Sequence, residues 1–211
     1  MKKQAIAQVG MVAPIIFASV FLIEGWYRPD YHPLSMFVSA LSLGTRGWIQ
    51  IANFIIFGIL LFVFSSGIAD EFPTGKASKW GPRLLKIIAM CYFFSGPFVM
   101  DTMGTPREEA SFHGILHGIF GGIVFSLMPV SCFVFLRRFQ EDPKWASLQV
   151  WTFVAGTVIT AAVILLTIAT KFPFGQAFFK DWLGLIQRAA ILPFMIWLFV
   201  FAFGFYKRLK S

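Results

Sequence analysis

Long apolar stretches alternate with short polar links along the chain. Six stretches approach or exceed the roughly 20 apolar residues that a helix needs to cross a bilayer. They cover residues 9–27, 48–67, 84–100, 113–136, 148–170 and 183–206. This pattern predicts an all-α, polytopic membrane protein, with residues 1–211 forming a single transmembrane domain built as a six-transmembrane-helix bundle.

The composition excludes a water-soluble domain. Hydrophobic residues make up 57% of the chain and charged residues 13%, whereas soluble domains average about 45–50% and about 25%. The net charge of +8 would suit a nucleic-acid partner, but the basic residues lie in short links between the spans. We therefore expect membrane lipids as partners and no nucleic acid.

The distribution of Lys and Arg predicts the orientation in the membrane. These residues are concentrated at the two termini and in alternate links, and the remaining links carry nearly balanced charge. Because cytoplasmic links are enriched in Lys and Arg, both termini are expected in the cytoplasm, with the protein in the cell (inner) membrane. The remaining polar residues then lie towards the outer face.

The first outer link carries a polar stripe. His32, Ser35, Ser39 and Ser42 are spaced three, four and three residues apart, with Pro33 near the start of this segment and Gly44 just after its end. This spacing predicts a short amphipathic helix in the first outer loop. Two interpretations remain open: the helix is an interfacial anchor with capping serines, or its polar stripe lines a pocket.

Two of the spans carry polar side chains near their outer ends. Arg46, Gln50 and Asn53 share one face of the second span, and Gln187 opens the last span. These four are candidate substrate-binding residues. Hydrogen bonding between helices is an equally good explanation for the amides.

Arg188 follows Gln187 inside the last span. Its side chain is expected to reach the outer interface or to pair with Asp101 or Glu24. A guanidinium at this depth can also hold a phosphate or carboxylate.

The fourth span carries two histidines one turn apart. Thr105 and Glu108 flank a Pro that suits a first helical turn, so the helix is expected to begin near Thr105. Glu109, His113 and His117 would then form one stripe. Two His at this spacing can ligate one metal ion, as in zinc hydrolases.

Three uses of this stripe remain open. His32 completes a candidate metal set with His113, His117 and Glu109, and Zn²⁺ is the expected ion. A hydrogen-bonded polar network is the second possibility. Haem binding is the third, although two His on the same helical face cannot sandwich one iron.

The sharpest hypothesis is a metal-dependent hydrolase that acts on lipid or a small amphiphile near the outer leaflet. Zinc lowers the pKa of a bound water towards about 7. The candidate catalytic residues are Asp101, Ser35, Ser39 and Arg188. The alternative is a non-enzymatic sensor, lipid-binding protein or transporter with the same pocket, and the apolar inner halves of the spans argue against transport.

Several motifs carry a family resemblance. They are HPLSMFVSALSLGTRGW, a third span that ends in Asp101, the run HGILH and a last span that opens with Gln187 and Arg188. With them the chain resembles the bacterial family called domain of unknown function 998 over about residues 10–205. The resemblance implies six membrane helices and no particular activity.

A weaker likeness concerns the inventory of residues. Alkaline ceramidases and adiponectin-receptor-like membrane hydrolases use three His, including an HxxxH pair, with a Ser and an Asp nearby. This chain is similar in offering three His, serines and Asp101. It departs in having six spans and in carrying HxxxH on the fourth span.

Overall fold

The computed structural model describes residues 2–75 and 77–210, and every regular element among them is helical. The α-helices are α1 (Lys3–Tyr27), α2 (Gly47–Ile68), α3 (Trp80–Ser95), α4 (Phe112–Glu141), α5 (Gln149–Lys171), α6 (Pro173–Phe179) and α7 (Leu183–Arg208). Short 3₁₀ helices are η1 (Val38–Ser42), η2 (Ala69–Glu71), η3 (Arg107–Glu109), η4 (Pro143–Leu148) and η5 (Lys180–Trp182).

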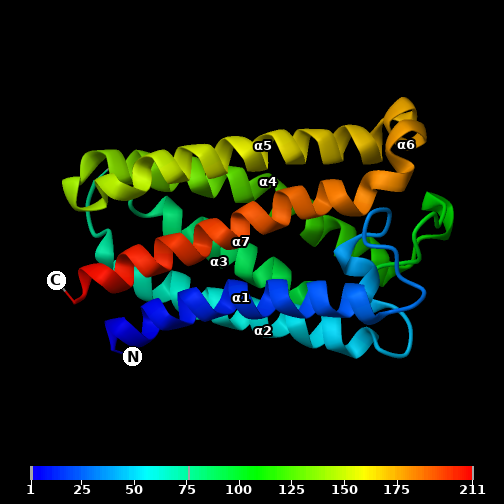
Figure 1. The fold of residues 1–211 in the computed structure, drawn as a ribbon, viewed down its shortest axis with the longest axis horizontal. Helices are drawn as coiled ribbons and strands as arrows, with labels where there is room; N and C mark the ends of the chain where they lie inside the picture. Colours follow the sequence, from blue (N-terminus) through cyan, green and yellow to red (C-terminus); the bar gives the residue numbers. More distant parts are fainter. Residues whose placement is uncertain (1, 76, 211) are drawn as a thin grey trace.

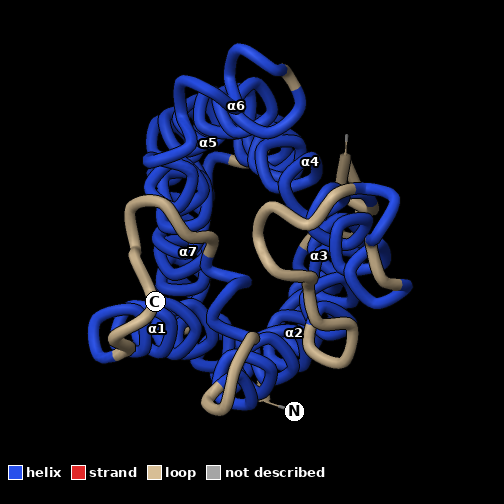
Figure 2. The backbone as a smooth tube through the Cα atoms, turned by 90° about the vertical axis from the view of Figure 1, so that its right-hand side faces the viewer, coloured by secondary structure: helices blue, strands red, loops and turns tan. Residues whose placement is uncertain are grey.

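The long helices form a closed ring. Each one packs against two others, in the order α1, α2, α3, α4, α5, α7 and back to α1. Figure 1 shows successive helices running in opposite directions, and Figure 2 shows the ring along its axis. We call the end where α1 begins and α7 ends the terminal end, and the opposite end, with α6 and the links 28–46 and 96–111, the loop end.

Helix length and composition confirm a multi-pass membrane protein. Among the described residues, five helical stretches are long and apolar enough to cross a membrane: Lys3–Tyr27, Gly47–Glu71, Phe112–Glu141, Pro143–Lys171 and Pro173–Arg208. Helix α3 has 16 residues, so it is about 24 Å long at about 1.5 Å per residue. That is less than the roughly 30 Å of a hydrocarbon core.

Aromatic side chains fill the ring at the terminal end. Phe135, Phe139, Trp145 and Phe201 are at most 1% exposed. Phe201 lies in the middle, with its ring centroid 4.8 Å from that of Phe135 and 5.3 Å from that of Phe139. Such tilted and edge-on aromatic packing stabilises beyond the buried area itself. Cavities with polar walls are found at the loop end and, beside Arg137 and Gln140 of α4, at the terminal end.

The start of α4 differs from the sequence prediction. The helix begins at Phe112, and Ser111 caps it by accepting the backbone N–H of Gly114 at 3.0 Å. Thr105 instead closes a tight turn through a 2.8 Å bond to the carbonyl of Thr102. The predicted start near Thr105 is therefore wrong, and Glu109 lies in η3 and not on the helix that carries the histidines.

The first loop-end link also differs in detail. Its helix is confirmed only as the five-residue η1, which is too short to carry the whole predicted stripe. His32 and Ser35 lie in a turn before η1, where the Ser35 N–H bonds to the His32 carbonyl at 3.2 Å. The short helix α6 was not predicted; Pro173 occupies its first turn, as proline favours.

Candidate functional site

A pocket of about 490 Å³ opens at the loop end beside α4, α5 and α7. Gly114, Gly118, Gly121 and Gly122 of α4 form part of its wall. A Cβ added at any of the last three would meet no atom within 4 Å. Gly118, Gly121 and Gly122 therefore leave space open, and none of them allows another helix to approach closely. We call this cavity the glycine-walled pocket.

The lining of the glycine-walled pocket is amphipathic. Its polar lining includes Ser39, Asp101, His117, Thr167, Thr170, Lys171 and Gln187, and its apolar lining includes Phe37, Phe125, Val163 and Leu166. Asp101 precedes α4 and Lys171 ends α5, which places both at the loop end. Phe125 and Val163 lie several turns further along these helices. The pocket is thus charged at the loop end and more apolar in its depth.

His117 lies between this pocket and the centre of the ring. Its side chain is 7% exposed, and Nδ1 lies 2.8 Å from the carbonyl oxygen of Phe98. A carbonyl only accepts, so Nδ1 carries the proton and Nε2 of the neutral ring is an acceptor. His117 also lines a small cavity of about 30 Å³ beside Phe54, Tyr92 and Ser95.

Asp101 is fixed against the start of α4. Its Oδ2 accepts the backbone N–H of Ser111 at 3.0 Å. A carboxylate is favourable at this place because the helix N-terminus carries partial positive charge. A Cβ at Gly114 would collide with the same carboxylate. Gly114 thus permits the close approach of Asp101, whereas the other wall glycines leave space.

The buried polar residues at the start of α7 hold the link 28–46. Gln187 Oε1 accepts the N–H of Val38 at 2.6 Å. Arg188 Nη1 donates to the carbonyls of Pro33 at 2.6 Å and Met36 at 3.2 Å, and Nη2 bonds to the hydroxyl of Tyr31. Among the described residues no bond joins Arg188 to Asp101 or Glu24, and its guanidinium instead bonds to the link, which was not one of the expected alternatives.

Tyr31 completes this attachment from within the link. Burial raises the pKa of its hydroxyl, although the positive charge of Arg188 opposes the shift. The hydroxyl therefore keeps its proton at neutral pH and donates towards the carbonyls of Met36, at 3.2 Å, and Phe37, at 3.0 Å. The link is fixed in place as a wall of the pocket.

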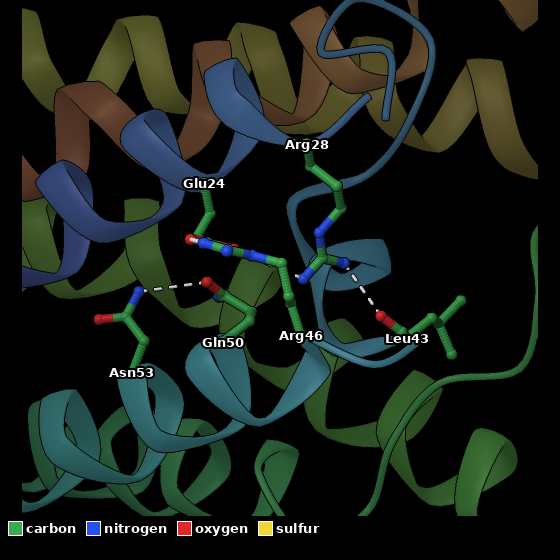
Figure 3. Close-up of polar contacts among 6 residues, drawn as sticks. All are labelled: Glu24, Arg28, Leu43, Arg46, Gln50 and Asn53. Atoms are coloured by element: carbon green, nitrogen blue, oxygen red, sulfur yellow. Dashed lines mark hydrogen bonds and ion pairs between the residues drawn. The ribbon is translucent and has the colours of Figure 1, made fainter. Parts of the chain in front are cut away.

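A second polar group lies between α1, α2 and the same link (Figure 3). Arg46 donates to the carboxylate of Glu24 through two nitrogens of its guanidinium. Nε lies 3.2 Å from Oε2, and Nη2 bonds to Oε1. Arg28 Nη2 lies 3.6 Å from the same carboxylate, and its Nη1 donates to the Leu43 carbonyl at 2.9 Å. Glu24 is therefore the common anion of two arginines.

Gln50 and Asn53 continue this group into the ring. Asn53 Nδ2 donates to Gln50 Oε1 at 3.2 Å and to the Phe17 carbonyl at 3.1 Å. Of the candidate substrate-binding residues, only Gln187 lines the glycine-walled pocket. Arg46, Gln50 and Asn53 instead bond within the protein, and a ligand role for them stays a prediction.

The three histidines do not converge. His32 and His113 are exposed, and the His113 ring packs on Phe98 with centroids 5.5 Å apart. Within residues 2–75 and 77–210, no group of three or more His, Cys, Asp or Glu is placed to hold a metal ion. Zinc and haem stay predictions that this arrangement does not favour. Of the candidate catalytic residues, Asp101 and Ser39 line the pocket, and Ser35 and Arg188 do not.

Neither the glycine wall nor Lys171 was predicted from the sequence as part of a site. Gly114, Gly118 and Gly121 are spaced four and three residues apart, so they share one helical face. This spacing was a usable signal in the run that also carries the two histidines. No sequence pattern pointed to Lys171, because no motif near it predicts that the end of α5 lines the same pocket as Asp101.

Comparison with known proteins identifies a family of unknown function. No curated protein and no solved structure matches the chain significantly. A family model described as a protein of unknown function, DUF998, matches residues 11–204. That match covers nearly the whole helical ring, including both sides of the glycine-walled pocket, and it confirms the resemblance carried by the sequence motifs. The chain belongs to the DUF998 family.

Proposed function

We propose that this protein binds a membrane-borne amphiphile in the glycine-walled pocket, as a non-enzymatic lipid-binding or sensor protein. The observation that carries the proposal is the open space along Gly118, Gly121 and Gly122 in a cavity of about 490 Å³. Small-molecule sites typically measure about 300–1,000 Å³ and combine apolar walls with a few polar groups.

The lining favours a ligand with one polar end. Lys171, Asp101 and Gln187 would face the head group, and Phe125, Val163 and Leu166 would contact the tail. The ammonium of Lys171 favours an anionic head, because the Asp101 carboxylate is already engaged with the Ser111 N–H. A fatty acid has this chemistry and serves as a probe.

A metal-dependent hydrolase that acts on the same amphiphile is less well supported. It needs His32 and His113 beside His117, and both are exposed side chains outside the pocket lining. The Nδ1 of His117 is already bonded to Phe98. Binding without hydrolysis requires only the groups that line the cavity.

We propose further that all six long helices, α3 included, cross the cell membrane, with both termini cytoplasmic and the pocket towards the outer face. The support is the charge distribution. At the loop end the acidic and basic side chains balance, whereas basic residues are in excess at the terminal end. Lys and Arg enrichment is typical of cytoplasmic ends.

The binding proposal is tested by fluorescence titration of detergent-purified protein with dansyl-undecanoic acid. A Cβ at Gly121 would meet no atom within 4 Å, so Gly121→Leu is expected to direct its side chain into the open space, to fold and to lose at least tenfold in affinity. Lys171→Gln is expected to lose a few-fold. The matched control is Ala161→Leu, on an exposed face of α5 outside the pocket.

Two results would contradict the proposal. One is wild-type protein that shows no saturable binding of the probe. The other is a Gly121→Leu variant that keeps wild-type affinity while its thermal unfolding shows a folded protein.

A further inference from the structure

A separate apolar groove runs between α2 and α3 on the outside of the ring. Its lining consists of Gly58, Ile59, Phe62, Val63, Ala89, Met90, Phe93 and Phe94, and its volume is about 380 Å³. A Cβ at Gly58 would lie 2.6 Å from the backbone nitrogen of Phe93 and 2.7 Å from the carbonyl oxygen of Ala89. The two backbones therefore touch at Gly58, while larger side chains such as Ile59 and Phe94 remain exposed beside the contact.

Basic side chains approach this groove from the terminal end. Lys79, Arg83 and Lys86 are spaced four and three residues apart, and Met90 of the groove follows four residues later. These spacings put Arg83, Lys86 and Met90 on one face of α3, and Lys79 lies just before the helix begins. The Lys86 ammonium lies 5.7 Å from the ring centroid of Phe62, a wall residue of the groove. One helix face thus passes from cations directly into the apolar groove.

The three cations have no carboxylate partner within residues 2–75 and 77–210. None of the ion pairs among the described residues includes Lys79, Arg83 or Lys86. Arg83 instead lies over the Trp80 ring, with Cζ 5.5 Å from the centroid. Their positive charge is available to an external anion.

The positions of the cations and of the groove along α3 match the head group and the acyl chain of a lipid. Lys86 lies six residues after the start of α3, about 9 Å along the helix at about 1.5 Å per residue. A lysine at this depth extends its ammonium back to the head-group level while its stem stays in the apolar layer. The groove then lies at the level of the acyl chains.

We propose that one anionic phospholipid binds along α3, with an acyl chain in the α2–α3 groove and its phosphate and head group at Lys86, Arg83 and Lys79. Apolar packing alone would accept any phospholipid, so the cations make the site selective for a negative head group. The head-group end of this site lies at the terminal end, opposite the glycine-walled pocket, and the site does not depend on the function proposed for that pocket.

The test is native mass spectrometry of detergent-solubilised protein titrated with phosphatidylglycerol or with phosphatidylcholine of the same acyl chains. Wild type is expected to retain one phosphatidylglycerol in clear preference to phosphatidylcholine. The double variant Arg83→Gln, Lys86→Gln is expected to lose roughly fivefold in phosphatidylglycerol retention per charge removed, with phosphatidylcholine unchanged. The matched control, Lys207→Gln with Lys210→Gln, removes two charges from the same end away from the groove and is expected to retain the preference.

A second variant tests the groove itself. Ile59→Trp fills the groove from an exposed position, so it is expected to reduce retention of both lipids while the protein still folds. Three results would overturn the proposal: equal retention of the two lipids by wild type, equal losses in the α3 double variant and the control, or unchanged lipid retention in a folded Ile59→Trp variant.

Discussion

Arg188 Nη1 lies 2.6 Å from the carbonyl oxygen of Pro33, a residue 155 positions earlier in the chain. One turn away, the N–H of Leu185 donates to the carbonyl of Leu34 at 2.9 Å. The first turns of α7 therefore hold the link 28–46 by its backbone. Because Phe37 and Ser39 of this link line the glycine-walled pocket, the contact fixes one wall of the site.

Replacing Arg188 tests this attachment. Arg188→Leu removes several charged hydrogen bonds, including the Nη1 bond to the Pro33 carbonyl, so it is expected to lower the free energy of unfolding by about 3 kcal/mol. Arg188→Lys keeps the charge but not the planar fork, and is expected to recover only part of the loss. Thermal unfolding in detergent measures the loss, and limited proteolysis measures the release of the link.

The control for this pair is Arg107→Leu, which changes an exposed arginine at the same end and is expected to shift stability by less than about 0.5 kcal/mol. If Arg188→Leu unfolded at the wild-type temperature and its link 28–46 resisted protease as well as in the wild type, Arg188 would not be needed to fix the link in place.

Two glycines on one face of α4 give a matched comparison. At Gly114 a Cβ collides with the Asp101 carboxylate, whereas at Gly118 it meets nothing. Gly114→Ala is expected to displace Asp101 from the Ser111 N–H and to destabilise the fold by about 1–3 kcal/mol. Gly118→Ala is expected to be neutral or stabilising by up to about 1 kcal/mol, because Ala favours helix more than Gly does.

Thermal unfolding of the two alanine variants side by side checks this difference. Equal destabilisation would mean that helix flexibility, and not the approach of Asp101, explains the glycine at position 114. The Asp101→Asn variant separates the two causes further, since it weakens the charged bond at the start of α4 without adding a side chain to the helix.

Most of the helices were predicted well, because the length of an apolar stretch can be read from neighbouring residues in the sequence. The predicted spans 48–67 and 183–206 lie within two residues of α2 and α7 at each end. The third span was displaced, because the predicted range 84–100 begins four residues after α3 begins and ends five residues after α3 ends. The start of α4 was also wrong, because short-range polar signals compete there. Thr105 offered a plausible cap, but Asp101 and Ser111 together satisfy the first N–H groups near the start of α4, and that arrangement depends on a tertiary contact.

The site was harder to predict because ring closure decides which polar residues meet. Periodicity grouped Arg46, Gln50 and Asn53 correctly on one face, but it gave no sign that Glu24 of α1 would pair with Arg46. It also treated His113 and His117 as equivalent. In the ring of helices, His117 faces inward and bonds to Phe98, whereas His113 is exposed. The two side chains differ by only about 40° in direction around the helix axis, and the sequence alone does not resolve that difference.

This difference between the histidines has a measurable consequence. His117→Ala removes a buried ring and leaves the Phe98 carbonyl unpaired, so it is expected to destabilise by about 2–3 kcal/mol. His113→Ala removes an exposed ring and is expected to lower stability by less than about 1 kcal/mol. Thermal unfolding of both variants measures the two effects.

Elemental analysis of protein purified without a His tag tests the zinc hypothesis on the same variants. The arrangement of the histidines leads us to expect metal well below one equivalent in the wild type. One equivalent of zinc that is lost equally in His113→Ala and His117→Ala would favour the hydrolase and contradict the structural role assigned to His117.

Whether the short helix α3 crosses the membrane is tested by cysteine labelling. In a background with the buried Cys91 and Cys132 replaced by Ala, single cysteines are introduced at Lys79, before α3, and at Arg107, after it. Both positions are exposed.

If α3 crosses and the termini are cytoplasmic, an impermeant maleimide added to intact spheroplasts labels the cysteine at 107, and the cysteine at 79 reacts only after lysis. Lys180→Cys and Lys144→Cys provide reference positions at the loop end and the terminal end. Labelling at 79 from outside would place the basic residues of α3 on the outer face, contrary to the orientation that their charge favours.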